Sequence, residues 1–431
     1  MQNIQTSPSR RIAVIGAGIS GMAAADALAP GHSVTLIESA PRLGGHARTV
    51  LAGRTGEQPV DTGFIVYNRP NYPNLVKLFE DLGVPVAESD MSFAASIEGG
   101  RIEYSLQTLD TLFAQRSLAF SPPYLRMVRD VFRFNARAGE MDIAPDLSLG
   151  AFLTRMGLGQ EFRDWYIGPI SGAIWSTPSQ NVMDFPAAAM LRFFRNHNLL
   201  HHTGQHVWYT VDGGSIQYVS RLEARMRARG VDIRLGAPVE GLRRLPGGVE
   251  IRVRGGEWER FDDVVLATHS DVALSLLSDA SEAETTHLRD IRYQDNRGIL
   301  HRDPSAMPRR RKVWASWNYS EAKRGGDDRL GLTYWMNRLQ NIDESDPLFL
   351  TLNPQSTFRD EDIYDDNTFR HPVYDLAMLK AVEGMRALNG TANTWFCGAW
   401  MRNGFHEDGI ASALDVVQAM SRRTPMGIAA A

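Results

Sequence analysis

Three glycines near the N-terminus, Gly16, Gly18 and Gly21, have the spacing of a phosphate-binding turn. They follow an apolar run that begins at Ile12 and precede an alanine-rich run that ends at Leu28. In such a turn the first glycine allows the tight bend, the second lets the backbone approach a pyrophosphate, and the third lets helix and strand pack closely. The helix N-terminus then faces the phosphates. These residues predict the strand, turn and helix that bind a dinucleotide.

A carboxylate stands where an acid would bind the ribose of that dinucleotide. The second apolar run, residues 33–38, ends in Glu38, about twenty residues after the glycines. Ile19 and Ser20 open the expected helix and Ser39 follows the acid. We therefore include all four residues in the candidate cofactor site.

A second pair of glycines follows in the segment that contains Arg42, Gly44, Gly45 and His46. Paired glycines let another loop lie against the cofactor, although a surface turn before the next strand explains the pair equally well. The segment resembles the R-x-G-G segment of the glutathione-reductase-like flavoproteins, in particular the FAD-dependent amine oxidase and phytoene desaturase superfamily. The resemblance implies that FAD is the cofactor and that this segment lines its phosphates and ribityl chain.

Three later segments extend the resemblance. Residues 211–219 resemble the family's G-G-x-x-x-L segment, and residues 264–270 resemble a strand that ends in Ala267 and Thr268 near the cofactor. Residues 395–414 resemble the closing flavin motif, which opens a helix whose free N–H groups can face the flavin's pyrimidine oxygen. The remaining candidates for cofactor binding are Thr62, Gly63, Phe64, Val239, Gly398, Trp400, Glu407, Asp408, Gly409 and Ile410.

Two departures from the family pattern bear on the chemistry. Relatives often carry an acid just after the position of Gly398, where this chain has Ala399 and Trp400. True amine oxidases carry a tyrosine of the substrate-flanking aromatic cage at the position of Phe405, which has no hydroxyl, so an amine substrate is less expected. No motif names a catalytic acid or base. The candidates for substrate contact are Phe405, His406, Tyr334 and Trp317.

The composition is that of a large globular enzyme. The 431 residues are 43% apolar and 22% charged, which suits two domains better than one. The formal net charge of -4 provides no overall field for nucleic acid, so we expect no nucleic-acid partner. Residues 1–11 lack the apolar core of a secretion signal, and no apolar run approaches the roughly twenty residues that span a bilayer. We therefore expect a cytoplasmic protein.

The cofactor segments are separated in the sequence, which predicts a discontinuous FAD-binding domain with an inserted substrate-binding domain. The FAD-binding domain is expected to comprise residues 1–80, 205–280 and 388–431. The substrate-binding domain is expected to comprise residues 81–204 and 281–387, with a helical part over about residues 108–204.

The inserted domain is expected to contain a largely antiparallel sheet over the flavin. One hairpin should turn at Gly99 and Gly100, and the apolar runs over residues 313–319, 332–336 and 348–352 are typical of further strands. The expected fold class is α/β, a Rossmann-like domain of the glutathione reductase type with an inserted α+β domain.

The stretch from residue 124 to residue 137 combines aromatic side chains with arginines, among them Arg126, Arg129 and Arg133. Such a helix can lie in a membrane interface with its arginines at the lipid phosphates, or it can be a core-facing helix with a solvated basic side. The basic cluster at residues 307–312 leaves the same choice between lipid phosphate and a solvated loop. Peripheral contact with the inner face of the membrane depends on the first alternative.

Five histidines, His197, His201, His202, His206 and His269, raise the question of a metal site. His197 and His201 are four residues apart and could share a helix face, but no third ligand has convincing spacing. We expect no bound metal.

Short strings narrow the resemblance to a bacterial branch of NAD/FAD-binding, amine-oxidase-like proteins that is associated with cyclopropane and methylated or furan fatty acid metabolism. The strings are residues 61–68, 315–319, 333–337, 351–354, 371–374 and 404–409. The resemblance implies an FAD-dependent desaturase or oxygen-using oxidase of a modified fatty acyl chain, free or in a phospholipid. A peroxide-producing amine oxidase and a redox-neutral flavin isomerase remain as alternatives. The expected partner is a lipid or other apolar small molecule, and the oligomeric state stays open.

Overall fold

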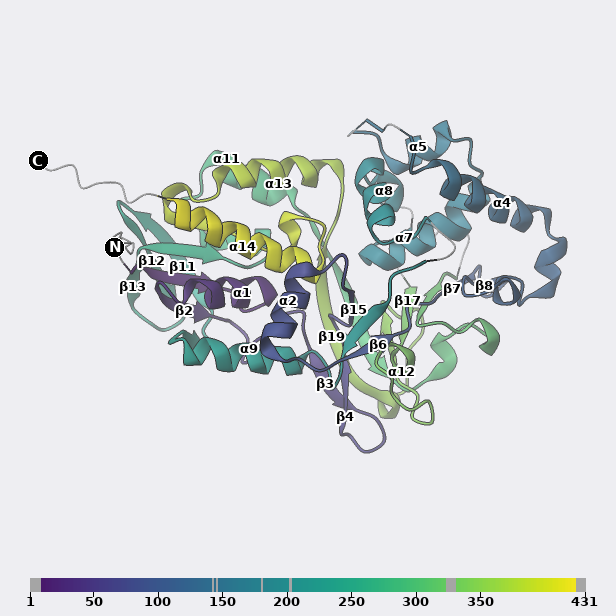
Figure 1. The fold of residues 1–431 in the computed structure, drawn as a ribbon, viewed down its shortest axis with the longest axis horizontal. Coiled ribbons are helices and arrows are strands. Elements are labelled where there is room, and N and C mark those ends of the chain that lie inside the picture. The colour runs from purple at the N-terminus through teal and green to yellow at the C-terminus, as the bar shows by residue number, and fades with distance from the viewer. Residues whose placement is uncertain are drawn as a thin grey trace, which may run out of the picture.

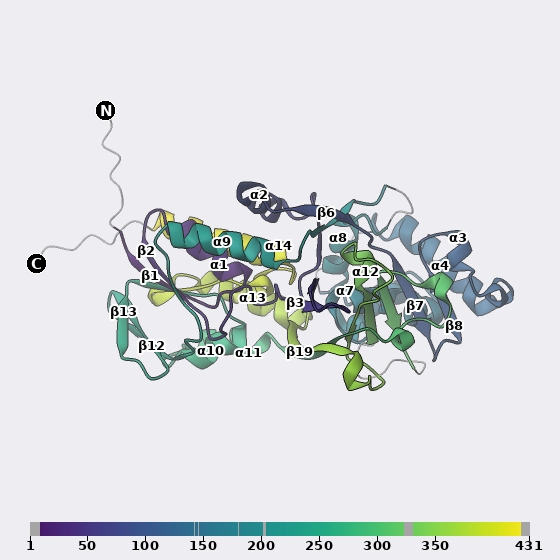
Figure 2. The same ribbon diagram turned by 90° about the horizontal axis from the view of Figure 1, so that it is seen from below.

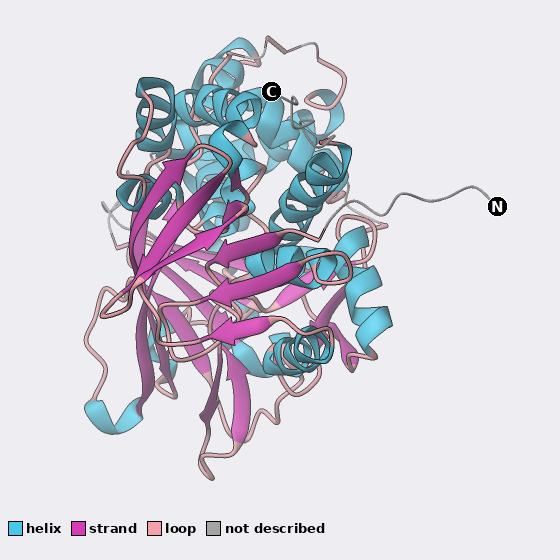
Figure 3. Ribbon diagram, turned by 90° about the vertical axis from the view of Figure 1, so that its left-hand side faces the viewer, coloured by secondary structure: helices cyan, strands magenta, loops and turns pink. Residues whose placement is uncertain are grey.

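The computed structural model describes residues 9–141, 143–144, 146–179, 181–200, 204–322 and 331–423. The molecule is elongated and has two halves (Figure 1). One half holds a parallel sheet with helices packed around it, and the other combines a mainly antiparallel sheet with a group of helices. Seen along the long axis, most of the helices lie on one side of the strands (Figure 3).

The parallel sheet has five strands in the order β10-β2-β1-β14-β20. These strands are β1 (Arg11–Ile15), β2 (Ser33–Ile37), β10 (Asp232–Arg234), β14 (Asp263–Leu266) and β20 (Thr394–Phe396). β1, β2 and β14 are mostly apolar and buried, as strands of a covered parallel sheet must be. β1 has β2 on one side and β14 on the other, which places the switch point of the sheet at the glycine turn. The predicted Rossmann-like domain is confirmed.

Helices and a small antiparallel sheet enclose these strands. α1 (Ile19–Leu28) contacts α9 (Ile216–Ala228) and packs closely along α14 (His406–Arg422), and α2 (Pro73–Leu82) contacts both of those helices. In Figure 2, α9, α1 and α14 form one layer above α13 (Leu376–Leu388), α10 (Ser270–Leu276) and α11 (Glu282–Asp290). The small sheet consists of β11 (Val239–Leu245), β12 (Gly248–Val253) and β13 (Trp258–Phe261).

α11 and α13 correct the predicted domain boundaries. Residues 281–387 were expected in the substrate-binding half, but these two helices pack against each other beside the parallel sheet (Figure 1). Arg244 of β11 donates two hydrogen bonds, of 2.7 and 3.1 Å, to the carboxylate of Glu284 in α11. The boundaries at residues 280 and 388 are therefore wrong, and the cofactor-binding half includes both helices. An amphipathic helix carries no sign of which domain will cover its apolar side, so the sequence could not place them.

The other half is built on a seven-stranded sheet in the order β19-β15-β18-β17-β16-β7-β8. Its strands are β7 (Phe93–Ile97), β8 (Ile102–Ser105), β15 (Tyr293–His301), β16 (Trp317–Ser320), β17 (Gly331–Trp335), β18 (Phe349–Leu352) and β19 (Ile363–Pro372). The expected hairpin and the three expected strands are present, and every pair is antiparallel except β7 with β16. The two longest strands, β15 and β19, escape prediction because charged residues interrupt the apolar alternation that indicates a strand.

The predicted helical part is present within residues 108–204, as far as these are described. It comprises α3 (Leu109–Leu112), η1 (Arg116–Phe120), α4 (Pro122–Arg137), α5 (Leu149–Arg155), α6 (Gln160–Phe162), η2 (Arg163–Ile167), α7 (Gly168–Trp175), η3 (Asn181–Asp184) and α8 (Ala187–Asn196). α4 starts at Pro122 because proline fits the first helical turn, and it buries Tyr124, Met127 and Phe134 at helical spacing. None of the described helices is long and apolar enough to cross a bilayer.

Short elements join the two halves around a buried carboxylate. β3 (Thr49–Ala52) pairs with β4 (Gln58–Asp61), β9 (Trp208–Val211) lies between β5 (Val66–Asn68) and β6 (Val86–Ser89), and α12 (Met336–Leu339) follows β17. Asp61 accepts hydrogen bonds from Thr49 Oγ1 at 2.6 Å, from the Ser215 N–H at 2.9 Å and from Gln340 Nε2 at 3.1 Å. Burial raises the pKa of Asp61 to about 6 despite these donors. One carboxylate thus ties together segments from both halves.

Replacing Arg244 by methionine tests the place of α11. The side chains of Arg244 and Glu284 are 9% and 3% exposed, so the substitution leaves a buried carboxylate without its cation. We expect the free energy of unfolding, measured by urea denaturation, to fall by about 3–5 kcal/mol. Arg254→Met is the control, because the pair of Arg254 with Glu240 is largely exposed and contributes at most about 1 kcal/mol. Equal losses in the two variants would contradict a structural role for the buried pair.

Candidate active site

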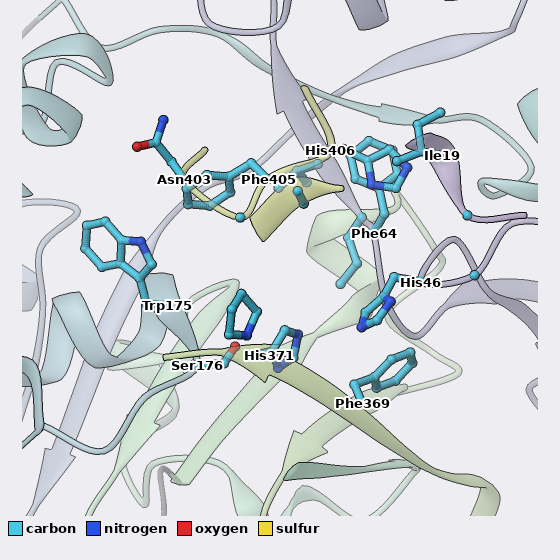
Figure 4. Close-up of a pocket in the computed structure, with 18 of the residues that line it drawn as sticks. Ile19, His46, Phe64, Trp175, Ser176, Phe369, His371, Asn403, Phe405 and His406 are labelled. Atoms are coloured by element: carbon cyan, nitrogen blue, oxygen red, sulfur yellow. The ribbon is translucent and has the colours of Figure 1, made fainter. Parts of the chain in front are cut away.

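One large cavity lies between the two halves of the molecule (Figure 4). Its volume is about 1060 Å³, and it is lined by the glycine turns, by strands of the seven-stranded sheet and by α7 and α8. The structure brings to this cavity the predicted cofactor residues Gly16, Gly18, Ile19, Ser20, Glu38, Ser39, Gly44, Gly45, His46, Thr62, Gly63, Phe64, Val239, Ala267, Thr268, Gly398 and Trp400. It also brings there the four candidates for substrate contact, Phe405, His406, Tyr334 and Trp317. Direct contact of each residue with a cofactor stays a prediction.

Two glycines of the first turn, Gly16 and Gly21, are packed so closely that a side chain cannot replace a hydrogen there. Gly16 has a φ of +96°, and a Cβ there would lie 2.7 Å from the Ala267 carbonyl oxygen. A Cβ on Gly21 would lie 1.8 Å from the carbonyl oxygen of Gly16, so Gly21 serves the packing of α1 and does not line the cavity. At Gly18, by contrast, no atom lies within 4 Å of the Cβ position, and this open face borders the cavity. A phosphate can approach the backbone there.

The second glycine pair lies directly against the first turn. The Gly44 N–H donates to the Ala17 carbonyl at 2.8 Å, and a Cβ on Gly45 would lie 2.9 Å from the Gly18 Cα. The guanidinium of Arg42 donates to the carbonyl of Gly45 at 2.8 Å and to two other carbonyls of the same loop. Arg42 therefore braces the loop and is not among the residues that line the cavity, and its contact with a cofactor stays a prediction.

Glu38 lies at the edge of the cavity, at the end of β2, as its spacing from the glycines predicts. Its carboxylate accepts hydrogen bonds from the Ala17 N–H at 2.6 Å, the Ala40 N–H at 2.8 Å and Ser39 Oγ at 3.1 Å. It holds the backbone of the glycine turn, and an ionised carboxylate can accept about four hydrogen bonds, so these three do not exhaust it.

The start of α14 differs from the prediction. The Glu407 carboxylate accepts hydrogen bonds from the N–H groups of Asn74 and Leu75, at 3.1 and 3.0 Å, and so binds the N-terminus of α2. Asp408 accepts from the Phe405 N–H at 2.9 Å. A Cβ on Gly409 would lie 2.8 Å from Ser20 Oγ, and Ile410 is in the apolar core. These four residues fix α14 in place and do not line the main cavity, and their predicted contact with a cofactor stays a prediction.

Three histidines face one another at the centre of the cavity, and their proximity could not be foreseen from the sequence. The ring centroids of His269 and His371 both lie 5.7 Å from that of His46. Figure 4 shows the rings of His46 and His371 near each other in the cavity. Burial lowers the pKa of His46, that of His269 to about 4 and that of His371 to about 3. All three imidazoles are therefore uncharged near neutral pH. Asn296 Nδ2 lies 2.8 Å from His371 Nδ1, which makes Nδ1 the acceptor and leaves the proton on Nε2.

A fourth histidine, His406, stands at the N-terminus of α14. Its ring stacks on Phe64 with centroids 3.9 Å apart, and burial lowers its pKa to about 3. The Tyr218 hydroxyl lies 2.7 Å from His406 Nε2, and burial raises the pKa of this tyrosine well above its ordinary value. The phenol therefore donates, and the proton of His406 is on Nδ1.

Aromatic side chains wall the end of the cavity far from the glycine turns. Phe193 of α8 stacks on Phe405 with centroids 5.0 Å apart and on His197 at 3.8 Å, and Trp175 of α7 lies 4.8 Å from Phe193. On the sheet side, Trp317 and Tyr334 meet edge to face. Trp175 and Phe193 are not among the candidate residues named from the sequence, although the aromatic residues Trp165, Tyr166 and Trp175 are a sequence signal for such a wall.

Of the histidines considered as metal ligands, His197, His206 and His269 line the cavity, whereas His201 and His202 lie outside the described residues. Within the ranges that the structure describes, no group of three histidine, cysteine, aspartate or glutamate side chains is arranged to hold a metal ion.

A dinucleotide-binding half that shares one deep cavity with an inserted half of sheet and helices is the architecture of a two-domain flavoprotein oxidoreductase. The sequence matches the family model described as flavin containing amine oxidoreductase over residues 19–325, which is more than half of the chain. The protein belongs to this family. It is an FAD-dependent oxidoreductase.

Solved structures of other enzymes have the same fold. A conjugated-linoleic-acid-producing fatty acid isomerase from P. acnes has a TM-score of 0.70 at 17% identity, with 96% of this chain and 99% of that chain covered. A putrescine oxidase variant has a TM-score of 0.68 at 15% identity, with 96% of this chain and 99% of that chain covered. Cyclohexylamine oxidase from Brevibacterium oxydans IH-35A has a TM-score of 0.66 at 16% identity, with 96% of this chain and 100% of that chain covered. A search of curated protein sequences finds no match. At these identities the likeness establishes the fold and leaves the substrate open.

The residues at the cavity fit FAD. The open face of Gly18 at the N-terminus of α1 can receive the pyrophosphate, and Glu38 can receive a ribose hydroxyl. Gly44 and Gly45 bring a second loop to the same place without side chains in the way. The flavin end would then lie toward His46 and the histidine cluster.

Replacing Glu38 by alanine should weaken FAD binding. The substitution removes both the charged partner for the ribose and the acceptor that holds the Ala17 N–H. We expect a loss of about 1.5–3 kcal/mol, which is a roughly 10- to 150-fold higher Kd measured by flavin release on dilution. Glu57→Ala, at an exposed residue of the β3–β4 turn, is the control. Unchanged flavin content in Glu38→Ala would remove this residue from the ribose site.

The buried histidines predict that acid destabilises the fold. His371 has a pKa of about 3 in the folded state and 6.5 as its ordinary value, so between these values the unfolded chain binds a proton that the folded chain does not. The contribution of the uncharged histidine to the free energy of unfolding is fully present above about pH 6.5. It declines as the pH falls, by about 1.4 kcal/mol per pH unit for each such histidine. His371→Asn should reduce the slope of unfolding free energy against pH, measured by urea denaturation between about pH 6 and pH 4. A slope equal to that of the wild type would contradict the burial of an uncharged His371.

Proposed function

We propose that the protein oxidises an elongated apolar substrate, and that this substrate is a modified fatty acyl chain. The observation that carries the proposal is the apolar lining of the cavity beyond the histidine cluster. That part is lined by Phe93, Leu106, Ile170, Ala173, Ile174, Trp175, Phe193, Leu199, Trp208, Leu350 and Leu352, among others. A hydrocarbon chain gains free energy by entering such a lining, whereas a polar substrate would lose its hydration there.

The charges around the cavity support an uncharged reacting group. Asp90 is the acidic residue of this apolar part among the lining residues described, and its carboxylate accepts hydrogen bonds from the Ser92 N–H at 2.7 Å and from Ser316 Oγ at 2.9 Å. Arg338 also contacts it at 3.2 Å. An alkylammonium group would therefore find no carboxylate without partners in this part of the cavity.

Bound FAD supplies the acceptor for a hydride from a substrate carbon. The side chains of this protein do the rest: aromatic rings exclude water and hold the chain, and uncharged imidazoles stand near the flavin end as proton acceptors. His46 keeps an uncharged ring near neutral pH because burial lowers its pKa, and it is the candidate proton acceptor. The Nδ1 lone pair of His371 already accepts a hydrogen bond from Asn296. Removal of a hydride and a proton from adjacent carbons leaves a double bond, which is a desaturation.

The choice of an acyl chain rests on resemblance as well as on the cavity. The residue strings of the bacterial branch associated with cyclopropane and methylated or furan fatty acids are present in this chain. The similar fold of the P. acnes enzyme, which is named a fatty acid isomerase, supports a lipid substrate in this architecture. Amine oxidation is the second candidate, because the matching family model is that of the flavin containing amine oxidoreductases.

Anaerobic mixing of the FAD-loaded protein with candidate substrates tests the proposal. We expect methyl-branched or cyclopropane acyl chains to abolish the visible absorbance of oxidised flavin, and primary amines to leave it unchanged. Bleaching by amines alone would show the second candidate to be correct. Conversion of an acyl chain without net bleaching would indicate a redox-neutral isomerase instead. Mass spectrometry of lipids from cells with and without the protein would then identify the natural substrate.

Filling the apolar part of the cavity should block the acyl chain and spare the cofactor. Ile174 of α7 is half-buried and lines the cavity, so Ile174→Trp places an indole in the path of the chain. We expect flavin bleaching by acyl substrates to slow by at least about tenfold while FAD content stays unchanged. Ala151→Trp, on the exposed side of α5, is the matched control. Bleaching by acyl chains at the wild-type rate in Ile174→Trp would place the substrate elsewhere.

A further inference from the structure

We propose that the outer end of the helical part is a docking surface for an anionic phospholipid bilayer. We call this region the tip surface and define it by Leu109, Arg116, Phe120, Leu125, Arg129 and Lys312. The proposal deepens the proposed function and rests on it for its purpose, because acyl chains in a bilayer must reach the cavity. Binding of the tip surface to a bilayer does not itself depend on the proposed function.

The tip surface exposes large apolar side chains. Phe120 and Leu109 are 87% and 73% exposed, which makes them the two most exposed large apolar residues in the part of the chain that the structure describes. Leu125 is exposed as well. Figures 1 and 2 show α3 and α4 at the end of the molecule farthest from the parallel sheet. These side chains therefore stand on a protruding end, where a flat bilayer can meet them.

α4 has two different faces. Tyr124, Met127 and Phe134 bury one face in the core, as the core-facing alternative requires. The opposite face carries Leu125 and Arg129 one turn apart, and Arg129 is 61% exposed despite its contact with Asp130. A solvated face needs only polar residues. Apolar side chains between arginines are instead the pattern of a helix that lies in a membrane interface.

Cations gather at the same end because one carboxylate holds two of them. Asp110 of α3 forms ion pairs with Arg116 and with Lys312, which belongs to the basic cluster at residues 307–312. The neighbouring Arg311 places its guanidinium 3.9 Å from the ring centroid of Trp314. The side chains of Arg116, Arg311 and Lys312 are 66%, 61% and 49% exposed and have further N–H donors available. Their charge complements that of lipid phosphates.

The tip surface is continuous with the cavity. Leu106 and Gln107 line the cavity, and the chain runs from them directly into α3 with Leu109 at its start. Leu106 is itself partly exposed. Along the sequence, the exposed apolar residues of the tip alternate with arginines: Leu109, Arg116, Phe120, Leu125 and Arg129 follow in this order. A fluid bilayer can accommodate such separate protrusions, and it is also the source of long acyl chains.

Flotation of the FAD-loaded protein with vesicles tests this surface. We expect binding to vesicles of phosphatidylglycerol and phosphatidylcholine, weak binding to phosphatidylcholine alone, and a decrease with added salt. The double variant Leu109→Ser, Phe120→Ser should lower partitioning into anionic vesicles by at least about tenfold, since both apolar side chains lose their insertion. Arg129→Gln and Lys312→Gln should each lower it about fivefold.

Matched controls separate the tip surface from general effects. Leu51→Ser removes another apolar side chain, 64% exposed, on β3, and Arg254→Gln removes an exposed arginine near the small sheet. Both controls should bind vesicles like the wild type. Unchanged FAD content and circular dichroism show that the tip variants are folded. Wild-type protein that fails to float with anionic vesicles, or tip variants that float as well as it does, would overturn the proposal.

Failure of the proposed function gives a different result. Vesicle binding that is lost in the tip variants, without flavin bleaching by any acyl chain, would support the docking surface and reject the acyl substrate. Bleaching by detergent-dispersed acyl chains without any binding to vesicles would reject the docking surface and support the substrate. When both hold, the tip variants should lose turnover on vesicles and keep it on detergent-dispersed substrate.

Discussion

The close approach of backbone segments at the glycine turns is the constraint on which the rest of the structure depends. A Cβ on Gly21 would overlap the carbonyl of Gly16, and one on Gly45 would press on Gly18. Gly409 likewise allows α14 to lie against the start of α1. Segments from both ends of the chain therefore meet as bare backbone, and N–H groups form the cofactor end of the cavity. Every wall residue is placed relative to this contact.

A second feature of the cavity is that most of its buried wall carries no charge. The walls beyond the glycine turns are largely aromatic or aliphatic, with Asp90 and Arg370 as charged exceptions, and the histidines among them stay uncharged because the interior disfavours the imidazolium. An enzyme that moves a hydride to a flavin benefits from such surroundings, since water and stray cations are kept from the reacting atoms. The same surroundings suit the hydrocarbon chain that we propose as the substrate. Cofactor chemistry and substrate selection thus depend on one property of the cavity.

The two halves share this cavity because long strands carry residues from one to the other. β19 brings Phe369 and His371 to the flavin end, while its partner β15 brings Tyr293, which stacks on His269 with centroids 4.4 Å apart. Asp61 joins the halves from the other side through Thr49, Ser215 and Gln340. The helical part then closes the far end of the cavity and presents its outer surface to the surroundings.

The sequence by itself determined the glycine turn, Glu38, the Rossmann-like domain and the family, because these depend on local spacing along one strand, turn and helix. It also placed the hairpin at Gly99 and the helical part, whose periodicity is local. Only the tertiary structure decided that Glu407 and Asp408 cap backbone N–H groups, that Arg42 braces a loop, and that α11 belongs to the cofactor half. It alone brought together His46, His269 and His371, which are separated by more than a hundred residues in each case. Their approach follows from strand pairing and helix packing between distant segments, and such contacts leave no periodic signal in the chain.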